Sequence, residues 1–394
     1  MRILLNTVAA TAGGGLTYLK HAVPSLASVP GIRLSVLVPP GLQEIPEMSD
    51  VIWVKFPANR GSAARFWREQ RAIPQIISRL GIDVLISAGN FALKNSPVPQ
   101  ILLSRNALYT SGDFCRDLLR RQHYAIWLDT KVKGALAKRS IRWADVTVAP
   151  SAAFASDLRA QTGRDVIAIH HGFDLDQFTS RTKPLSASVQ KELDAAQDCV
   201  RLLLVSHYNY YRNFETLLRG LALLKRQAPE KKFKLFLTCK FCSSENPGAY
   251  RAEGAATLVR SLGVREEVVE LGMIPREQLP DLYRSCHLYV TAAYAESFAH
   301  PLVEAMASGL PIVASDIGVH REICAESAVF FNRFSAEELA VGVLKVMQER
   351  GRYEELSTRA RARSREFSWA KHAREVVYLA QCLLEGQNCR AHCA

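Results

Sequence analysis

The segment that decides the fold reads Glu296-Ser-Phe-Ala-His-Pro-Leu-Val-Glu304 and continues as Ala305-Met-Ala-Ser-Gly-Leu-Pro-Ile-Val-Ala-Ser315. Pro301 suits the first turn of a helix, where the N–H group that proline lacks would have no partner within the helix. The other free N–H groups of that turn, together with the helix dipole, form a cradle for a phosphate. Glu296 and Glu304 flank this cradle. Carboxylates in such a place suit hydroxyl groups, which indicates a ligand with a sugar on one side and a ribose on the other.

Outward from this segment, short apolar runs alternate with longer amphipathic stretches. In the C-terminal half the pattern predicts strands at 201–205, 234–237, 268–271, 288–290, 311–314 and 328–331, and helices at 213–226, 276–284, 301–308 and 336–349. In the N-terminal half it predicts strands at 2–8, 33–38, 84–87, 100–103, 146–149 and 166–169, with helices at 16–27 and 63–80. This alternation is typical of βα units around a parallel sheet.

The length of 394 residues suits two domains of similar size. We therefore expect an α/β protein of two doubly wound, Rossmann-like domains that face each other across a cleft. The first domain covers 1–180, a linker rich in Ser and Thr covers 181–197, and the second domain covers 198–368. Ligands of such sheets usually bind at the carboxyl ends of the strands.

The composition is that of a globular chain, with 48% hydrophobic and 22% charged residues. No apolar run approaches the roughly 18 residues that a membrane helix needs. The first ten residues are better explained by a strand that runs into a turn than by a signal peptide. Nine scattered cysteines suggest no disulfide framework, so we expect a reduced, cytoplasmic protein. The lone Cys239-x-x-Cys242 is weak evidence for zinc or redox chemistry.

The net charge of +12 is concentrated in the N-terminal half. Residues 1–180 hold 21 Lys/Arg against 13 Asp/Glu, whereas the remainder holds 29 against 25. Such a bias indicates an anionic partner. No nucleic-acid recognition motif accompanies the charge, so we expect no nucleic-acid partner. Residues 59–71 are basic and aromatic at helical spacing. They either lie on the inner face of an anionic membrane as a peripheral contact or form a solvated helix face, with Phe66 and Trp67 partly in the core.

The segment 296–315 resembles glycosyltransferase family 4, the group 1 transferases of GT-B fold, whose mark is two glutamates separated by seven residues and followed by A-M-A-x-G-x-P-V. Segments 271–283, 315–323 and 367–369 also resemble that family, in its order. The resemblance covers 200–370, while 1–180 matches mainly in pattern.

The resemblance implies a retaining enzyme that moves a hexosyl sugar from a GDP- or UDP-linked donor to a hydroxyl of a glycan or lipid-linked acceptor. It implies a role in surface polysaccharide or glycolipid synthesis, with neither a metal nor another cofactor. It also implies that residues 369–394 form a helix that crosses back to the N-terminal domain.

The resemblance assigns roles to single residues. Glu296 would bind hydroxyls of the donor sugar and Glu304 the ribose. The backbone amides near Phe298 and Ala299 would face the distal phosphate, although the family usually has Gly where Ala299 stands. The backbone of the segment that contains Met273 and Ile274 would contact the base.

A second phosphate-binding element is expected after the strand at 201–205. His207 stands where the family has Arg, and Arg212 stands where it has Lys. Arg212 can neutralise a departing diphosphate through a bidentate contact. His207 is either a hydrogen-bond donor whose charge depends on pH or a structural histidine. We take Glu296, Arg212 and His207 as the catalytic candidates.

Candidates in the N-terminal half follow predicted strands. The loop Ala12-Gly-Gly-Gly-Leu16 is either a tight turn or a place where the backbone approaches the donor diphosphate, through Gly14 and Gly15. The loop lacks the dinucleotide-binding fingerprint. Arg105, Asn106 and Asn90 are the acceptor-side candidates.

Other functions stay open on the sequence alone. Asp174-Leu-Asp176 has the spacing of a metal-binding pair, but it lies in a stretch that resembles the family's domain junction, so we expect it to be structural. Another nucleotide-sugar enzyme such as an epimerase, a sugar phosphorylase, or an inactive binding module are the alternatives. The departures at Ala299 and His207 favour the last of these.

Overall fold

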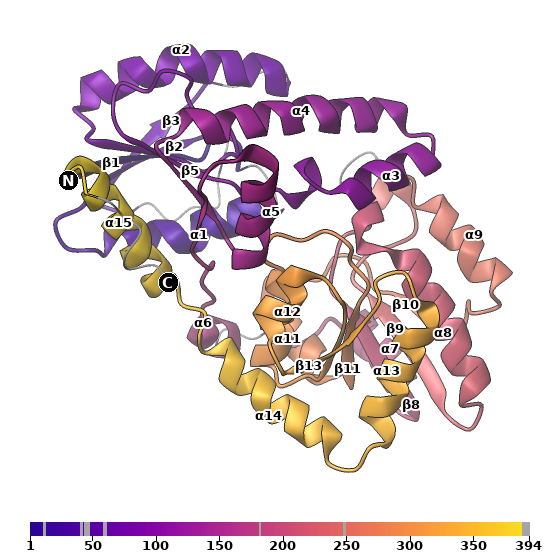
Figure 1. The fold of residues 1–394 in the computed structure, drawn as a ribbon. Helices are drawn as coiled ribbons and strands as arrows, with labels where there is room; N and C mark the ends of the chain where they lie inside the picture. The colour runs from indigo at the N-terminus through magenta and orange to yellow at the C-terminus, as the bar shows by residue number, and fades with distance from the viewer. Residues whose placement is uncertain are drawn as a thin grey trace. The chain divides into compact units, whose positions relative to one another are not determined.

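The structure is a computed structural model that describes residues 1–10, 13–39, 42, 48–57, 61–180, 183–246 and 250–387 (Figure 1). The chain divides into two compact units. Unit 1 comprises 1–172 together with 367–394, and unit 2 comprises 173–366. The N-terminal part of the first unit thus ends at 172, whereas the sequence predicts a first domain that ends at 180.

Unit 1 is built on a parallel sheet whose described strands follow the order β3-β2-β1-β4-β5-β6-β7. These strands are β1 (Arg2–Asn6), β2 (Arg33–Val38), β3 (Val51–Lys55), β4 (Val84–Ser87), β5 (Gln100–Leu103), β6 (Val146–Ala149) and β7 (Ile167–Ala168). Because β1 has β2 on one side and β4 on the other, the direction of winding reverses at β1. Strand β3 was not predicted from the sequence.

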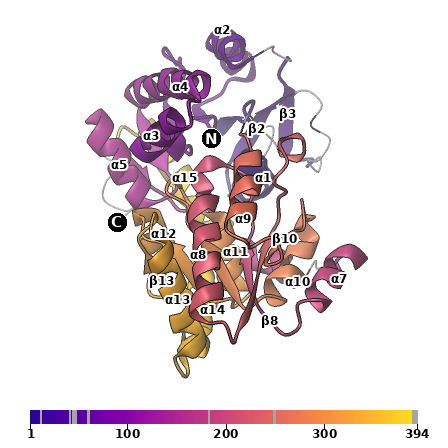
Figure 2. The ribbon, with the colours of Figure 1, turned by 90° about the vertical axis from the view of Figure 1, so that its right-hand side faces the viewer.

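Helices cover both faces of this sheet. They are α1 (Gly13–Ala27), α2 (Ser62–Leu80), the 3₁₀ turn η1 (Ala107–Tyr109), α3 (Gly112–Arg120), α4 (Tyr124–Trp143), α5 (Ala152–Thr162) and α15 (Trp369–Leu384). Helices α3 and α4 pack against each other (Figure 2). On one face, Leu4 and Leu85 of the sheet meet Ile73 and Ile77 of α2.

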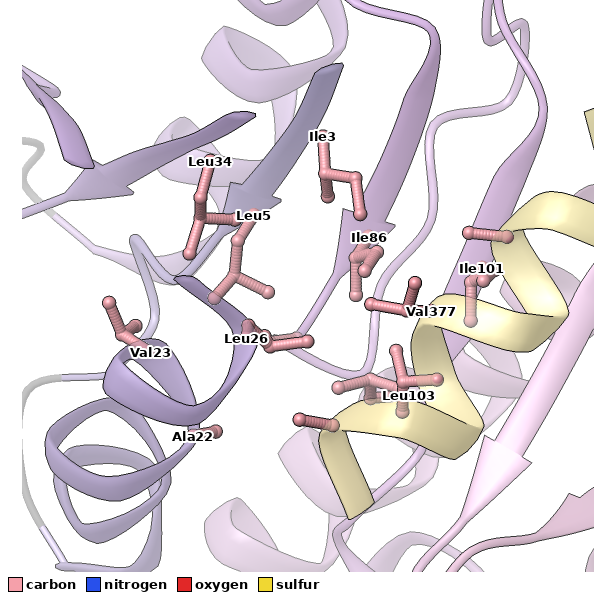
Figure 3. Packing of buried hydrophobic residues seen from close by; sticks show 14 of the residues in the cluster. Ile3, Leu5, Ala22, Val23, Leu26, Leu34, Ile86, Ile101, Leu103 and Val377 are labelled. Atoms are coloured by element: carbon pink, nitrogen blue, oxygen red, sulfur yellow. The ribbon is translucent and has the colours of Figure 1, made fainter. Parts of the chain in front are cut away.

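The other face of the sheet brings the two ends of the chain into one core. Leu5 and Ile86 from the strands pack with Leu26 of α1 and Val377 of α15 (Figure 3). The approach is tight at Gly172, where a Cβ atom would lie 2.1 Å from the backbone nitrogen of Trp369. Helix α15 is therefore an integral part of the core of unit 1.

Unit 2 is built on a second parallel sheet, with its described strands in the order β10-β9-β8-β11-β12-β13. These strands are β8 (Cys199–Leu204), β9 (Lys232–Leu237), β10 (Val268–Glu270), β11 (Leu288–Thr291), β12 (Ile312–Ser315) and β13 (Ala328–Phe331). Strand β8 has β9 on one side and β11 on the other, so the winding reverses between β8 and β11. The prediction of two doubly wound α/β units is confirmed.

The helices of unit 2 include short 3₁₀ turns that position the site. The elements are α6 (Leu175–Ser180), α7 (Ala187–Asp194), η2 (Tyr210–Arg212), α8 (Phe214–Gln227), η3 (Ser243–Glu245), α9 (Glu253–Ser261), η4 (Arg276–Gln278), α10 (Leu279–Arg284), α11 (His300–Ala307), α12 (Gly318–Cys324), α13 (Ala336–Gln348) and α14 (Arg352–Ser364). Helix α7 lies inside the segment expected as a linker. Its N-terminus is capped by Ser186, and its Val189 and Leu193 are buried. No helix among the described ranges is long and apolar enough to cross a bilayer.

Candidate functional site

The point where the sheet of unit 2 reverses its winding carries the main candidates. Strands β8 and β11 are neighbours, so the segments that follow them begin side by side at the carboxyl edge of the sheet. The segment after β8 leads to Arg212 on η2, and the segment after β11 leads to Glu296. Ligands of doubly wound sheets bind at this kind of crevice. The fold thus brings together two residues that are 84 positions apart in the sequence.

Arg212 and Glu296 form a largely buried ion pair. An Nη1–H group of Arg212 donates to Glu296 Oε1, and the two side chains are only 14% and 10% exposed. The Arg212 guanidinium also lies 5.1 Å from the centre of the Tyr211 ring. The N–H of Tyr294 donates to the carbonyl of Tyr211 at 3.0 Å, which ties η2 to the loop that carries Glu296. The positions of both charged groups are therefore set by the backbone beneath them.

Burial and the opposite charge act in different directions on this pair. Burial raises the pKa of Glu296 above its usual range, and the Arg212 charge offsets that rise only in part. Burial would lower the pKa of Arg212, but Glu296 and Tyr211 outweigh it and raise that pKa above its usual value. The arginine is permanently charged, and the charge on Glu296 depends on the presence of Arg212.

The helix after this loop begins as the sequence predicted, at an unusual backbone conformation. Ala299, the residue before α11, has φ 65° and ψ 63°, and Pro301 lies in the first turn. A left-handed conformation costs about 1 kcal/mol or more for any residue with a Cβ. The related family's preference for Gly at this position thus has a backbone reason. Phe298 is fully buried, with its ring 4.9 Å from that of His300.

Glu304 is held in place by a tyrosine that the sequence analysis did not single out. The hydroxyl of Tyr283, on α10, donates to Glu304 Oε2 at 2.9 Å and lies 3.3 Å from the carbonyl of Pro301. Burial raises the pKa of Glu304, while Arg276 and the Tyr283 hydrogen bond oppose the rise. Tyr283 fixes one carboxylate oxygen, which leaves Oε1 as the oxygen that can turn to a ligand.

His207 and the predicted base-binding loop lie near the surface of unit 2. Partial burial and the nearby charge of Arg212 hold the pKa of His207 below its usual value, so the ring is neutral at pH 7. Within the described part of the chain, its ring forms no hydrogen bond. Met273 is 80% exposed, and Ile274 beside it is half-buried. The loop therefore offers its backbone and one flexible side chain to a ligand.

A fully buried histidine lies within reach of the Arg212 charge. His320, on α12, has its Nδ1 3.0 Å from the carbonyl of Ser315 and 3.1 Å from the Ser315 hydroxyl. Burial, opposed by the Ser315 hydrogen bond and assisted by the Arg212 charge, lowers the pKa of His320 to about 4. Because Nδ1 donates to the carbonyl, Nε2 carries the lone pair, and this buried atom has no partner among the described residues. The sequence places His320 within 315–323 but gives no sign of its burial.

Two of the acceptor-side candidates of unit 1, Asn90 and Arg105, are bonded to each other, and the third, Asn106, follows Arg105 in the chain. The N–H of Arg105 donates to Asn90 Oδ1 at 2.6 Å, and the Arg105 guanidinium donates to the carbonyl of Ala88. The same guanidinium lies 4.4 Å from the centre of the Tyr18 ring. Asn106 Oδ1 accepts from the N–H of Leu108 and so caps η1. Each of the three predicted side chains thus has a structural role at the carboxyl edge of the sheet.

Tyr18 belongs to a chain of hydrogen bonds that also involves α15. The Tyr18 hydroxyl is 3.0 Å from His372 Nε2, and His372 Nδ1 is 2.8 Å from the carbonyl of His170. Since only a donor can face that carbonyl, Nδ1 carries the proton and Tyr18 donates to Nε2. Burial lowers the pKa of His372 to about 4.

The glycine-rich loop of unit 1 opens α1. Gly14 and Gly15 lie in the first turn of that helix, and the two residues before Gly13 lie outside the described ranges. A Cβ at Gly15 would lie 3.2 Å from the Cα of Ala10, so this position has little room for a side chain. The predicted contact of Gly14 and Gly15 with a ligand stays a prediction.

The described ranges contain no group of three or more His, Cys, Asp or Glu side chains that could hold a metal ion. In the Cys239-x-x-Cys242 pair, Cys239 is buried and Cys242 is exposed. Burial and the charge of Glu270 raise the pKa of Cys239 to about 12, which disfavours the thiolate that zinc or redox chemistry needs. Asp176 lies in the first turn of α6, where a negative charge favours the helix.

Comparison with known families accounts for most of the chain. The model for glycosyl transferases of group 1 matches residues 188–363, which contain every candidate of unit 2. The model for Glycosyltransferase Family 4 matches residues 12–177, which contain the candidates of unit 1. The two matches follow the order and approximate bounds of the two units.

Curated relatives are similar mainly over part of their length. A D-inositol 3-phosphate glycosyltransferase of Corynebacterium aurimucosum is 24% identical over 233 residues, which are 58% of this chain and 54% of that protein. A mannosylfructose-phosphate synthase of Agrobacterium fabrum is 28% identical over 176 residues, 43% of this chain and 38% of that protein. The chain thus spans about half or less of the length of the curated relatives it matches.

Solved structures share the fold over nearly the whole chain. A sucrose-phosphate synthase of Thermosynechococcus elongatus has a TM-score of 0.75 at 17% identity, covering 98% of this chain and 100% of its own. HepE of Anabaena, solved in complex with UDP, has a TM-score of 0.68 at 16% identity, covering 97% of this chain and 100% of its own. These similarities establish the GT-B fold.

Proposed function

We propose, from the premise that this chain belongs to the group 1 glycosyltransferases of family 4, that it transfers a sugar from a nucleotide-diphosphate donor to an acceptor hydroxyl. The observation that carries the proposal is the buried Arg212–Glu296 pair at the reversal point of the second sheet, beside the first turn of α11. A fixed cation, a carboxylate and a helix N-terminus are three groups that suit a sugar diphosphate.

The donor would extend along the carboxyl edge of unit 2. Glu296 accepts hydrogen bonds from hydroxyls of the transferred sugar, and the first turn of α11 holds the distal phosphate. Glu304, with Oε2 fixed by Tyr283, accepts from the ribose. The backbone at Met273 and Ile274 faces the base.

Cleavage of the anomeric C–O bond leaves negative charge on the nucleoside diphosphate. Arg212 is charged at every physiological pH and its position is fixed before the reaction, so it stabilises this charge without a reorganisation step. A single preorganised donor of this kind contributes about 3 kcal/mol. His207, whose ring is neutral at pH 7, would donate a hydrogen bond to the same diphosphate.

We propose that the anomeric configuration is retained and that neither a metal ion nor another cofactor takes part, as the family resemblance implies. Solved structures of the same fold hold UDP or UDP-glucose, which favours a UDP-linked hexose over a GDP-linked one. The acceptor would be a glycan or lipid-linked sugar of surface polysaccharide or glycolipid synthesis. The positive charge of unit 1 supports an anionic acceptor and a peripheral contact with the inner face of a cell membrane.

Release of nucleoside diphosphate from a panel of nucleotide sugars tests the transfer. The purified chain is incubated with each donor and a lipid extract as the source of acceptors, with and without EDTA. We expect release from one donor family, unaffected by EDTA and at least about a hundredfold slower in Glu296→Gln. Donors that bind but release no diphosphate under any condition would favour a binding module and contradict the proposal.

A further inference from the structure

The net positive charge of residues 1–180 is concentrated in one region. Residues 61–145, which run from α2 to the end of α4, hold 14 Lys/Arg and 6 Asp/Glu. This excess of +8 equals the whole net charge of residues 1–180, so the rest of that half is neutral. Two thirds of the net charge of the chain therefore lies on less than a quarter of its length.

The same region exposes a row of large apolar side chains on α4. Tyr124, Leu128 and Val132 are 61%, 58% and 60% exposed. They recur every four residues, which places them on one face of the helix. The opposite face of α4 is buried in unit 1 through residues that include Gly134 and Ile141. Among the residues that the structure describes, nothing covers this face of a helix that is otherwise well packed.

Cations continue the same face toward the C-terminal end of α4. Lys131, Arg139 and Arg142 are exposed, and at 3.6 residues per turn they fall on the side of Tyr124 and Leu128. Unlike Lys133, which pairs with Asp129 on α4, these three form no ion pair with another described residue. Helix α4 therefore presents an apolar half followed by a cationic half.

Helix α2 supplies more groups of the same kind beside α4. A row of ring contacts from Phe66 through Phe91 to Tyr109 links α2 to η1, against which α4 packs, and Figure 1 and Figure 2 both show α2 and α4 next to each other. Trp67 of α2 is 61% exposed. Arg65, in contrast, is turned inward to the buried Glu69 at 3.2 Å.

We infer that the exposed face of α4 formed by Tyr124, Leu128, Lys131, Val132, Arg139 and Arg142 binds the surface of an anionic phospholipid bilayer, with Trp67 of α2 as a second apolar contact. An amphipathic helix with cations beside its apolar groups lies in the plane of such a surface. A second copy of the chain fits less well, because a two-fold contact would bring the same cations together. Nucleic acid fits less well because Leu128 and Val132, in the middle of the row, are aliphatic and do not stack on bases. The inference refines the membrane contact proposed above and needs no sugar transfer.

Vesicle flotation of the full chain tests this inference directly. Vesicles of equimolar phosphatidylglycerol and phosphatidylcholine are compared with pure phosphatidylcholine, at low and at high salt. We expect binding to the anionic vesicles at low salt. Because each cation near such a surface contributes about a fivefold factor, Lys131→Gln, Arg139→Gln and Arg142→Gln together should weaken partitioning roughly a hundredfold. Leu128→Gln with Val132→Gln should weaken it about tenfold or more.

Matched controls come from the exposed surface of unit 2. Arg219→Gln, Arg226→Gln and Arg350→Gln remove the same charge, and Val341→Gln removes an exposed apolar side chain of similar size. Both controls should bind as the parent does. The inference is overturned if the parent does not float with anionic vesicles. It is also overturned if the Leu128 and Val132 variant binds like the parent, because binding would then depend on charge alone. It is equally overturned if that variant only dissociates a dimer seen by sedimentation. None of these results would alter nucleotide binding by unit 2.

Discussion

Replacing Arg212 by Met tests the buried ion pair without opening a large cavity. The substitution leaves Glu296, which is only 10% exposed, with no opposite charge. Breaking a buried pair by removing one partner costs about 3 to 5 kcal/mol. For a unit of this size, each kcal/mol lowers the melting temperature by roughly 2 to 4 °C, so we expect a fall of roughly 6 to 20 °C.

The double variant separates the effect of the unpaired charge on stability from the effect of the altered side-chain packing. In Arg212→Met with Glu296→Gln neither charge remains, so the melting temperature should recover by at least half of what Arg212→Met lost. Single Glu296→Gln should also destabilise, because it leaves the arginine buried and unpaired. Calorimetry is the suitable assay. All five tryptophans lie in unit 1, so tryptophan fluorescence reports that unit and not the site.

The loss of stability in Arg212→Met should also depend on pH, and it should be larger at high pH. Burial already raises the pKa of Glu296, and without Arg212 that pKa rises further. The folded state then binds a proton that the unfolded state releases, so stability falls as pH rises above about 4.5 toward the folded pKa. The stability of Arg212→Met should therefore be nearer to that of the parent at about pH 5 than at about pH 8. Equal losses at both pH values, or a double variant no better than the worse single one, would refute this reasoning.

Three further predictions concern single side chains. Tyr283→Phe removes the donor to Glu304 and should weaken nucleotide binding about five- to tenfold in calorimetric titration, whereas no change would mean that this hydrogen bond does not serve the site. His320 and His372 have folded pKa values of about 4, so the unfolded state takes up protons first, and each should cost up to about 3 kcal/mol of stability as pH falls from about 6.5 to about 4. Gln in place of either histidine should flatten the acid limb of the stability curve, and an unchanged limb would contradict the assignment. Ala299→Gly should raise the melting temperature by about 2 to 4 °C, because glycine adopts φ 65° without strain; a lower melting temperature would contradict the left-handed conformation.

The strands were predictable because burial in a parallel sheet leaves a strong mark on the sequence. The run at 84–87, for instance, is a strand with the predicted bounds and is fully buried. Strand β3 (Val51–Lys55) was missed, because it lies at the edge of the sheet and its Ile52 and Lys55 are exposed. The pattern of burial that predicts a strand is weakest at such an edge.

Helix α4 shows where the sequence pattern misleads. Its exposed face carries Tyr124, Leu128 and Val132, and its buried face carries small or polar residues such as Thr130 and Gly134. The apolar periodicity therefore points away from the core, and the helix was not predicted. The same arrangement, with apolar side chains on the exposed face, is the reason why we infer that α4 binds a partner.

The candidate site, too, could be predicted from the sequence only in part. Glu296 and Glu304 could be predicted because they are close in the sequence. Only seven residues, which include the start of α11, separate them. The direct pairing of Glu296 with Arg212, 84 positions apart, could not be predicted, since it depends on β8 and β11 being neighbours in the sheet. Tyr283 and His320 were missed because a buried tyrosine or histidine has no distinct pattern until its hydrogen bonds are known.

Calorimetric titration with nucleoside diphosphates and their sugar derivatives is the decisive test of the donor site. We expect one site per chain for one nucleotide family, insensitive to EDTA and at least about tenfold weaker in Glu304→Ala. Lys225→Ala, on the exposed surface of α8, should titrate like the parent. No binding by any nucleotide to the folded chain, or binding that is unchanged in Glu304→Ala and Arg212→Met, would contradict a donor site at this edge of unit 2.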